Sequence, residues 1–241
     1  MSHSISNFHL YRLVDEESRD ALIEADDIQG FFVADDQETG TIILTGGERR
    51  EGFKKKTGST ALEIADFRGE RIGSYYLGPV VITANEAGSE FSFSGYVCEY
   101  PKAGEVWRRW ASERPLEYGE WSQYSDEYRE SWLHVVQNAW FTALRDATRY
   151  GTGDVVTIEG SDMTTRAGFY CALGEAVNGP GGYFGSNLDA LASCLSSTLK
   201  SGHSFHIVWN NHASARDWLG EDFMDSVAAV FQEFTIPVSW A

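Results

Sequence analysis

The fold of the C-terminal part of the chain is decided by the stretch Gly182-Tyr183-Phe184-Gly185-Ser186-Asn187-Leu188-Asp189-Ala190-Leu191-Ala192-Ser193-Cys194-Leu195. Ser186 is a good helix N-cap, because its hydroxyl can accept a hydrogen bond from a free backbone N–H group in the first turn. Asp189 is an acidic variant of the capping-box partner and suits the positive end of the helix dipole. The stretch therefore predicts a helix that begins after Ser186, with Tyr183 and Phe184 exposed in front of it.

The predicted helix has two different faces. Apolar residues recur at helical spacing and form one stripe, which consists of Leu188, Leu191, Ala192, Leu195 and Leu199. Ser186, Asp189, Ser193 and Lys200 point elsewhere. We expect the stripe to pack into a core and the opposite face to be available to another molecule.

Strands and helices alternate around this stretch. The pattern predicts strands over residues 154–160, 206–209 and 236–240, and helices over residues 165–177, 213–219 and 221–234. Residues 178–182 form a glycine-rich loop that we expect to be flexible. Alternating strands and helices are typical of a parallel sheet with helical crossovers.

The stretch Tyr183–Leu191, followed by Cys194-Leu195, resembles the barstar family, whose members inhibit ribonucleases such as barnase. The similarity is close there and looser from about Asp154 to the C-terminus. It implies a three-stranded parallel sheet with four helices. It also implies that the second helix and the loop before it enter a ribonuclease active site, where acidic side chains replace substrate phosphates. The partner contacts that the resemblance implies are Tyr183, Phe184, Gly185, Asn187, Asp189, Ser193 and Glu233.

Three positions depart from the family pattern. Ser193 stands where the family carries its dominant phosphate-mimicking aspartate, and Ala192 and Thr198 stand where it carries tryptophans. A central carboxylate of an interface can be worth several kcal/mol. Ser193 therefore favours a cognate partner other than barnase itself.

The first 150 residues resemble no family that we identify. Short apolar or alternating runs separated by turn residues predict about seven strands between Phe8 and Glu99, which indicates a sandwich or a barrel. The expected strands are residues 8–14, 28–34, 41–45, 61–65, 71–77, 80–84 and 91–99. An aromatic stretch at residues 101–128 predicts packing between domains, and a long helix is expected from Ser125 to about Tyr150. We expect an α+β chain of two domains, residues 1–150 and 151–241.

Composition narrows the choice of partner. The 241 residues carry a formal net charge of −17, which disfavours nucleic acid and anionic membranes and favours a basic protein. The odd number of cysteines, Cys98, Cys171 and Cys194, argues against a disulfide framework and suits the cytoplasm. No membrane-spanning stretch or export signal is evident. The oligomeric state does not follow from the sequence.

No arrangement of residues predicts catalysis, a cofactor or a metal site. His203, His206 and His212 lack a completing ligand, and Asp189 lacks a second carboxylate at helical spacing. We therefore expect an inhibitor of a basic ribonuclease or ribonuclease-type toxin, that is, an immunity protein, and not an enzyme. The alternative is a ligand-binding or regulatory protein that uses its N-terminal domain, with a ligand near Arg49–Lys56 or Trp107–Trp121.

Overall fold

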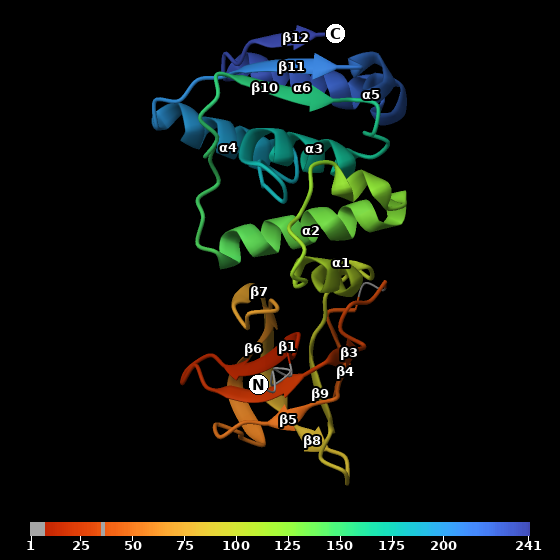
Figure 1. The fold of residues 1–241 in the computed structure, drawn as a ribbon, viewed down its shortest axis with the longest axis vertical. Helices are drawn as coiled ribbons and strands as arrows, with labels where there is room; N and C mark the ends of the chain where they lie inside the picture. Colours follow the sequence, from red (N-terminus) through yellow and green to blue (C-terminus); the bar gives the residue numbers. More distant parts are fainter. Residues whose placement is uncertain (1–7, 35–36) are drawn as a thin grey trace, which may run out of the picture. The chain divides into compact units, whose positions relative to one another are not determined.

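The computed structural model describes residues 8–34 and 37–241 (Figure 1). Its backbone divides into two compact units, Met1–Pro115 and Leu116–Ala241. The helix that follows Ser125 thus belongs to the unit that holds the C-terminal sheet. A domain boundary after residue 150 stays a prediction.

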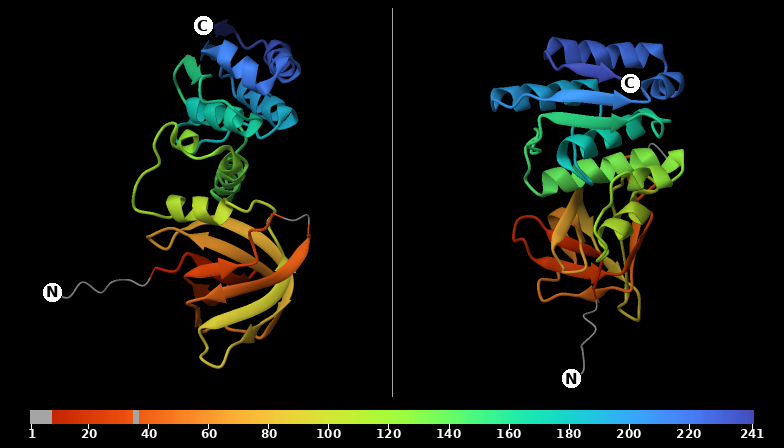
Figure 2. Two further views of the ribbon diagram at one scale, coloured as in Figure 1. Left: turned by 90° about the vertical axis from the view of Figure 1, so that its right-hand side faces the viewer. Right: turned by 45° about the horizontal axis from the view of Figure 1, so that its top comes forward.

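The first unit contains two antiparallel sheets. One has the strand order β5-β2-β1-β6-β7 and the other β3-β4-β9-β8. The strands are β1 Tyr11–Asp15, β2 Ala21–Ala25, β3 Asp27–Gln29, β4 Thr39–Thr45, β5 Glu48–Arg49, β6 Lys56–Ala65, β7 Arg71–Val81, β8 Thr83–Ala84 and β9 Glu90–Tyr96. β7 lies beside β9, so the two sheets curl around one core that includes Leu13, Leu62, Ile42 and Phe93 (Figure 2). The β-rich character predicted for this region is confirmed.

A short helix, α1 (Ala103–Trp110), closes part of this core. Its Trp107 is fully buried, and its indole N–H donates a hydrogen bond to Tyr75 Oη at 2.8 Å. Gly73 makes room for the ring, because a Cβ at this position would lie 2.6 Å from it. Trp107 thus packs inside its own unit, not between domains as the sequence led us to expect.

The second unit is built on a parallel sheet. β10 (Val155–Glu159), β11 (His206–Asn210) and β12 (Val238–Trp240) lie side by side in that order. The crossovers are α3 (Arg166–Asn178), α4 (Leu188–Lys200), α5 (His212–Leu219) and α6 (Glu221–Glu233). Alternate strand residues, such as Val156 and Ile207, are buried against these helices. The predicted three-stranded α/β architecture with four helices is confirmed.

Another helix, α2 (Asp126–Thr142), packs against α3 and against the short 3₁₀ helix η1 (Glu120–Gln123). The predicted extension to Tyr150 is wrong. Leu144 takes the left-handed conformation (φ 56°), Leu144 N donates to Phe141 O at 3.0 Å, and Arg145 N donates to Trp140 O at 3.3 Å. This is a Schellman motif, which ends the helix before the glycines that we expected to end it.

No helix in the described part of the chain combines the length and apolar character needed to cross a bilayer.

Candidate functional site

The start of α4 differs by one residue from the prediction. Asn187, not Ser186, is the N-cap, and its Oδ1 accepts a hydrogen bond from Ala190 N at 2.8 Å. Ser186 and Asn187 both have side chains that can cap a helix. The conformation of the backbone before them therefore determines which of the two is the N-cap. Asp189 keeps its expected place in the first turn.

That backbone depends on Gly185. Its φ is 105°, a conformation that only glycine adopts readily. A Cβ there would also lie 2.8 Å from the backbone nitrogen of Leu191, so the loop could not turn into α4 so tightly. Gly185 is therefore needed for the geometry of the loop, whatever it contacts on a partner.

Tyr183 and Phe184 are not exposed, and this expectation is wrong. Tyr183 is 3% exposed, and its ring centroid lies 5.3 Å from that of Phe141 in α2. Phe184 is fully buried, 6.1 Å from the ring of Phe205. Burial also raises the pKa of the Tyr183 phenol. Because α2 and the core cover these rings, they anchor the loop and do not face solvent.

The loop before α4 is held more firmly than its glycines suggested. Asn178, the last residue of α3, donates through Nδ2 to Tyr183 O at 2.8 Å and to Thr148 O at 3.1 Å. Its Oδ1 accepts from Tyr150 N at 2.7 Å. One side chain thus fixes both the loop and the segment that follows α2. The sequence pattern gave no signal for this role.

The buried side chain of Glu175, in α3, holds the segment around Trp121 in place by hydrogen bonds. Its Oε2 accepts hydrogen bonds from Gly119 N at 2.8 Å and from Trp121 Nε1 at 3.1 Å. Burial raises the pKa of this carboxyl, although these hydrogen bonds oppose the rise. The aromatic stretch around Trp121 therefore packs on α3 within its own unit.

The exposed face of α4 carries polar groups. Asn187, Asp189 and Ser193 are exposed, and Ser193 Oγ donates to the carbonyl of Asp189 at 2.9 Å. Among the described residues, no ion pair or hydrogen bond engages the Asp189 carboxylate. Glu233, also exposed, ends α6, which packs on α4. The surface of α4, its N-cap and α6 thus carries the exposed residues Asn187, Asp189, Ser193 and Glu233, whereas Tyr183 and Phe184 are buried.

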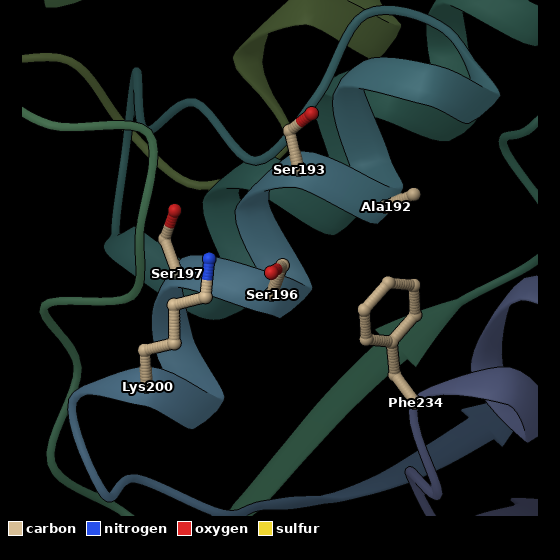
Figure 3. A pocket seen from close by; sticks show the side chains of 6 residues that line it. All are labelled: Ala192, Ser193, Ser196, Ser197, Lys200 and Phe234. Carbon is tan, nitrogen blue, oxygen red and sulfur yellow. The ribbon is translucent and has the colours of Figure 1, made fainter.

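A shallow depression of about 410 Å³ lies along this face (Figure 3). Its lining residues are Ala192, Ser193, Ser196, Ser197 and Lys200 from α4, together with Phe234. Figure 3 shows the hydroxyls and the Lys200 ammonium on one side and the Phe234 ring on the other. Of these residues, the sequence pattern indicated Ser193 as a contact but not Ser196, Ser197 or Phe234. Thr198 is fully buried and has no place on this surface.

The polar groups on this face of α4 suit binding to another protein. They are a carboxylate, hydroxyls and an ammonium. The one cysteine of α4, Cys194, is buried, which raises its thiol pKa to about 12 and leaves no thiolate at neutral pH.

A second polar cluster lies in the first unit. His9, Glu24 and Glu48 are the group of potential metal ligands that lie close together in the described residues. Arg50 already pairs with Glu24 at 2.5 Å and with Glu48 at 2.7 Å, so a guanidinium neutralises both carboxylates. In the stretch Arg49–Lys56, named above as a possible ligand site, Lys54 pairs with Asp15 at 3.0 Å and Arg49 lies over the ring of Phe53. Arg49, Arg50 and Lys54 therefore have structural partners.

Comparison with known proteins gives one match. The family model described as Barstar (barnase inhibitor) matches residues 153–237, which include β10, the four crossover helices and the exposed face of α4. Searches of curated proteins and of solved structures return no match. The barstar family consists of non-enzymatic inhibitors that bind a ribonuclease such as barnase, while the N-terminal region stays unassigned. Residues 153–237 are a barstar-family domain.

Proposed function

We propose that the chain is an inhibitor of a ribonuclease or ribonuclease-type toxin, an immunity protein that blocks the active site with α4 and the loop before it. The observation that carries the proposal is the exposed carboxylate of Asp189 in the first turn of α4, with Glu233 exposed on the adjoining helix. Carboxylates on a rigid surface can occupy the sites where a ribonuclease binds substrate phosphates.

Charge supports a basic partner. Residues 151–241 contain ten acidic residues against three basic ones, a net charge of −7. A field of this sign accelerates encounter with a basic ribonuclease, most strongly at low salt. The three cysteines are free and buried, which suits action in the cytoplasm.

The predicted contact residues take different parts in this proposal. Tyr183, Phe184 and Gly185 set the path of the loop from inside the unit. Asn187, Asp189, Ser193 and Glu233 meet the partner. Ser193 offers a hydroxyl in place of a carboxylate, so the cognate ribonuclease is expected to differ from barnase at the facing position.

The test is inhibition of barnase and of a panel of other basic ribonucleases by the full chain. Asp189→Asn and Glu233→Gln each remove one exposed charge at the proposed surface. Asp217→Asn, at an exposed residue of α5, removes the same charge elsewhere and is the matched control. We expect the first two variants to weaken inhibition at least tenfold and the control to change it less than twofold. If all three variants weaken inhibition equally, inhibition depends on the overall charge of the chain and the proposed contact surface is wrong.

A ligand-binding role of the first unit is the second candidate. An open pocket of about 400 Å³ there is lined by Phe8, Leu10, Asp26, Phe67, Arg108, Ala111, Ser112 and Glu113. Part of this lining, Arg108, Ala111, Ser112 and Glu113, lies in the Trp107–Trp121 stretch named above. Arg108 already pairs with Asp27 at 2.5 Å, and Asp26 and Glu113 also line the pocket, so the charges there do not favour an anion. A thermal-shift screen of small uncharged aromatic molecules, repeated with Phe67→Ala, tests this role. A shift that Phe67→Ala abolishes supports it, and no shift counts against it.

A further inference from the structure

A short segment between α2 and β10 is bonded both to α4 and to the residue that holds the loop before α4. This segment, the strap, consists of Thr148, Arg149, Tyr150 and Gly151. We infer that the strap positions the face of α4 for the partner, and that Thr198 is a positioning residue that acts through the strap. This inference rests on the proposed function. It adds to that function a segment that lies before residue 153, outside the family match.

The hydroxyl of Thr198 gives the first argument. The side chain is fully buried, and Oγ1 donates a hydrogen bond to Cys194 O at 2.8 Å, one turn earlier in α4. The same oxygen accepts from Arg149 N at 3.1 Å and lies 3.2 Å from Thr148 Oγ1. Because the one hydrogen of Thr198 Oγ1 goes to Cys194 O, Thr148 Oγ1 is the donor of the third bond. One hydroxyl thus fixes two strap residues to the last turn of α4.

The loop before α4 is fixed to the same strap by Asn178, which gives the second argument. Asn178 Nδ2 donates to Thr148 O at 3.1 Å and to Tyr183 O at 2.8 Å. Its Oδ1 accepts from Tyr150 N at 2.7 Å. Thr148 therefore bonds to α4 through its hydroxyl and to Asn178 through its carbonyl. The angle between the loop and α4 thus depends on the strap.

Close packing leaves the strap little freedom to move. A Cβ on Gly151 would lie 2.5 Å from Val177 O, so the strap passes close against the end of α3. The guanidinium of Arg149 lies 4.9 Å from the ring centroid of Phe205, the residue before β11. A surface that is ordered before binding loses little conformational entropy on association. The strap therefore contributes to affinity without contacting the partner.

The depression on α4 is lined from the turns that the strap holds. Ser197 and Lys200, which line it, share the last turn of α4 with Thr198. Ser193, which also lines it, directly precedes Cys194, whose carbonyl accepts from Thr198. A shift of α4 that breaks the bonds to the strap therefore moves these exposed residues as well. Groups that bind a partner must be held within about 0.5 Å of their productive positions.

The experiment measures association and dissociation rates of the full chain with each ribonuclease that it inhibits, well below the melting temperature. Thr198→Val keeps the shape of the side chain and removes the hydroxyl, whereas Thr198→Ser keeps the hydroxyl. Thr148→Val removes the strap hydroxyl at a half-buried residue and serves if Thr198→Val does not fold. Ile158→Val, at a buried residue of β10, lowers stability away from the strap and is the control.

The expected result is a change in dissociation only. Thr198→Val and Thr148→Val should dissociate roughly fivefold faster or more, because α4 loses a hydrogen bond that holds it in place. Their association rates should not change, because the charges that steer encounter are the same. Thr198→Ser should bind like wild type. Ile158→Val should lower the melting temperature and leave both rates unchanged.

The outcomes separate the two proposals. If Thr198→Val and Thr148→Val lower the melting temperature but not the lifetime of the complex, the strap supports only the fold and the inference is wrong. The proposed function then stands if Asp189→Asn still weakens inhibition. If Thr198→Ser dissociates as fast as Thr198→Val, the lost hydroxyl is not the cause and the inference fails. If no ribonuclease is inhibited, the proposed function fails and the inference falls with it.

Discussion

Asn178 Nδ2 donates a hydrogen bond of 2.8 Å to the carbonyl of Tyr183, while its Oδ1 accepts one of 2.7 Å from Tyr150 N. A single side chain at the end of α3 therefore joins the loop before α4 to the segment after α2. Tyr150 lies before the matched residues 153–237. The geometry of the proposed surface thus depends on chain that the family match does not include.

Replacement of Asn178 tests this dependence. Asn178→Ala leaves two backbone carbonyls and one N–H without their partner, and we expect it to lower the free energy of unfolding by about 1–3 kcal/mol. Hydrogen exchange at the Tyr150 amide should accelerate more than exchange in β11. Gln232→Ala, at an exposed residue of α6, is the control. Unchanged exchange at Tyr150 would show that the junction does not depend on Asn178.

Relief of backbone strain at Leu144 should stabilise the chain. A left-handed leucine costs about 1–2 kcal/mol, and glycine gives back about 0.4–1 kcal/mol through the entropy of the unfolded chain, so Leu144→Gly should gain roughly 0.5–1 kcal/mol. Thr235 has the same backbone form at the end of α6 (φ 55°), and Thr235→Gly should behave alike. Urea unfolding measures both. A loss of stability in Leu144→Gly would mean that the Leu144 side chain supports the fold despite its exposure.

Gly185 and Gly202 form a matched pair. Both have positive φ, 105° and 78°, but a Cβ would meet nearby backbone atoms only at Gly185. We expect Gly202→Ala to cost about 1 kcal/mol from backbone strain alone and Gly185→Ala to cost at least about 1 kcal/mol more. Thermal and urea unfolding give the two values. Equal losses would show that the loop moves aside without cost.

The buried Glu175 predicts an unusual pH dependence. Its pKa is raised above the ordinary value of 4.5, so the folded state holds the proton more tightly than the unfolded state does. Its contribution to stability is therefore full below pH 4.5 and is lost as the pH rises through the folded pKa. Glu175→Gln removes this titration while keeping an oxygen acceptor for Gly119 N and Trp121 Nε1.

The measurement is the free energy of unfolding of wild type minus that of Glu175→Gln between pH 4 and pH 8. We expect the difference to fall as the pH rises. A difference that grows with pH would show that the ionised carboxylate, held by its two hydrogen bonds, is the favoured form in the folded chain.

Ser193 offers a test by gain of function. Ser193→Asp restores the acidic residue that the family resemblance places at this position and exposes it beside Asp189. We expect tighter inhibition of barnase, by tenfold or more, and little change in stability because Ser193 is exposed. Ser196→Asp, one turn further along the depression, is the comparison. An equal gain from both variants would indicate attraction by charge alone.

The sequence predicted the second unit well because its signals are local. Alternating apolar residues in β11 and the leucine stripe of α4 depend on neighbouring residues only. The strand Ala21–Ala25 was missed because Ala-Leu-Ile-Glu-Ala lacks a period of two, and its place is set by pairing with β1 and β5. The strand Glu48–Arg49 and the helix Ala103–Trp110 were missed as well.

The errors at the site have a different cause. Tyr183 looks exposed in its own loop, and the helix that covers it lies about forty residues earlier in the chain. The end of α2 at Leu144 has the hydrogen bonds of a glycine cap without the glycine, so residue types could not mark it. Long-range packing thus decided the burial of Tyr183, whereas the end of α2 is set by local hydrogen bonds that its residue types do not indicate.

Occupation of a ribonuclease active site by the face of α4 can be measured by competition between the full chain and a mononucleotide bound at the active site of an inhibited ribonuclease. We expect the two to exclude each other, with the apparent dissociation constant of the chain rising in proportion to the mononucleotide concentration. A ternary complex, with the affinity of the chain unchanged at saturating mononucleotide, would contradict it.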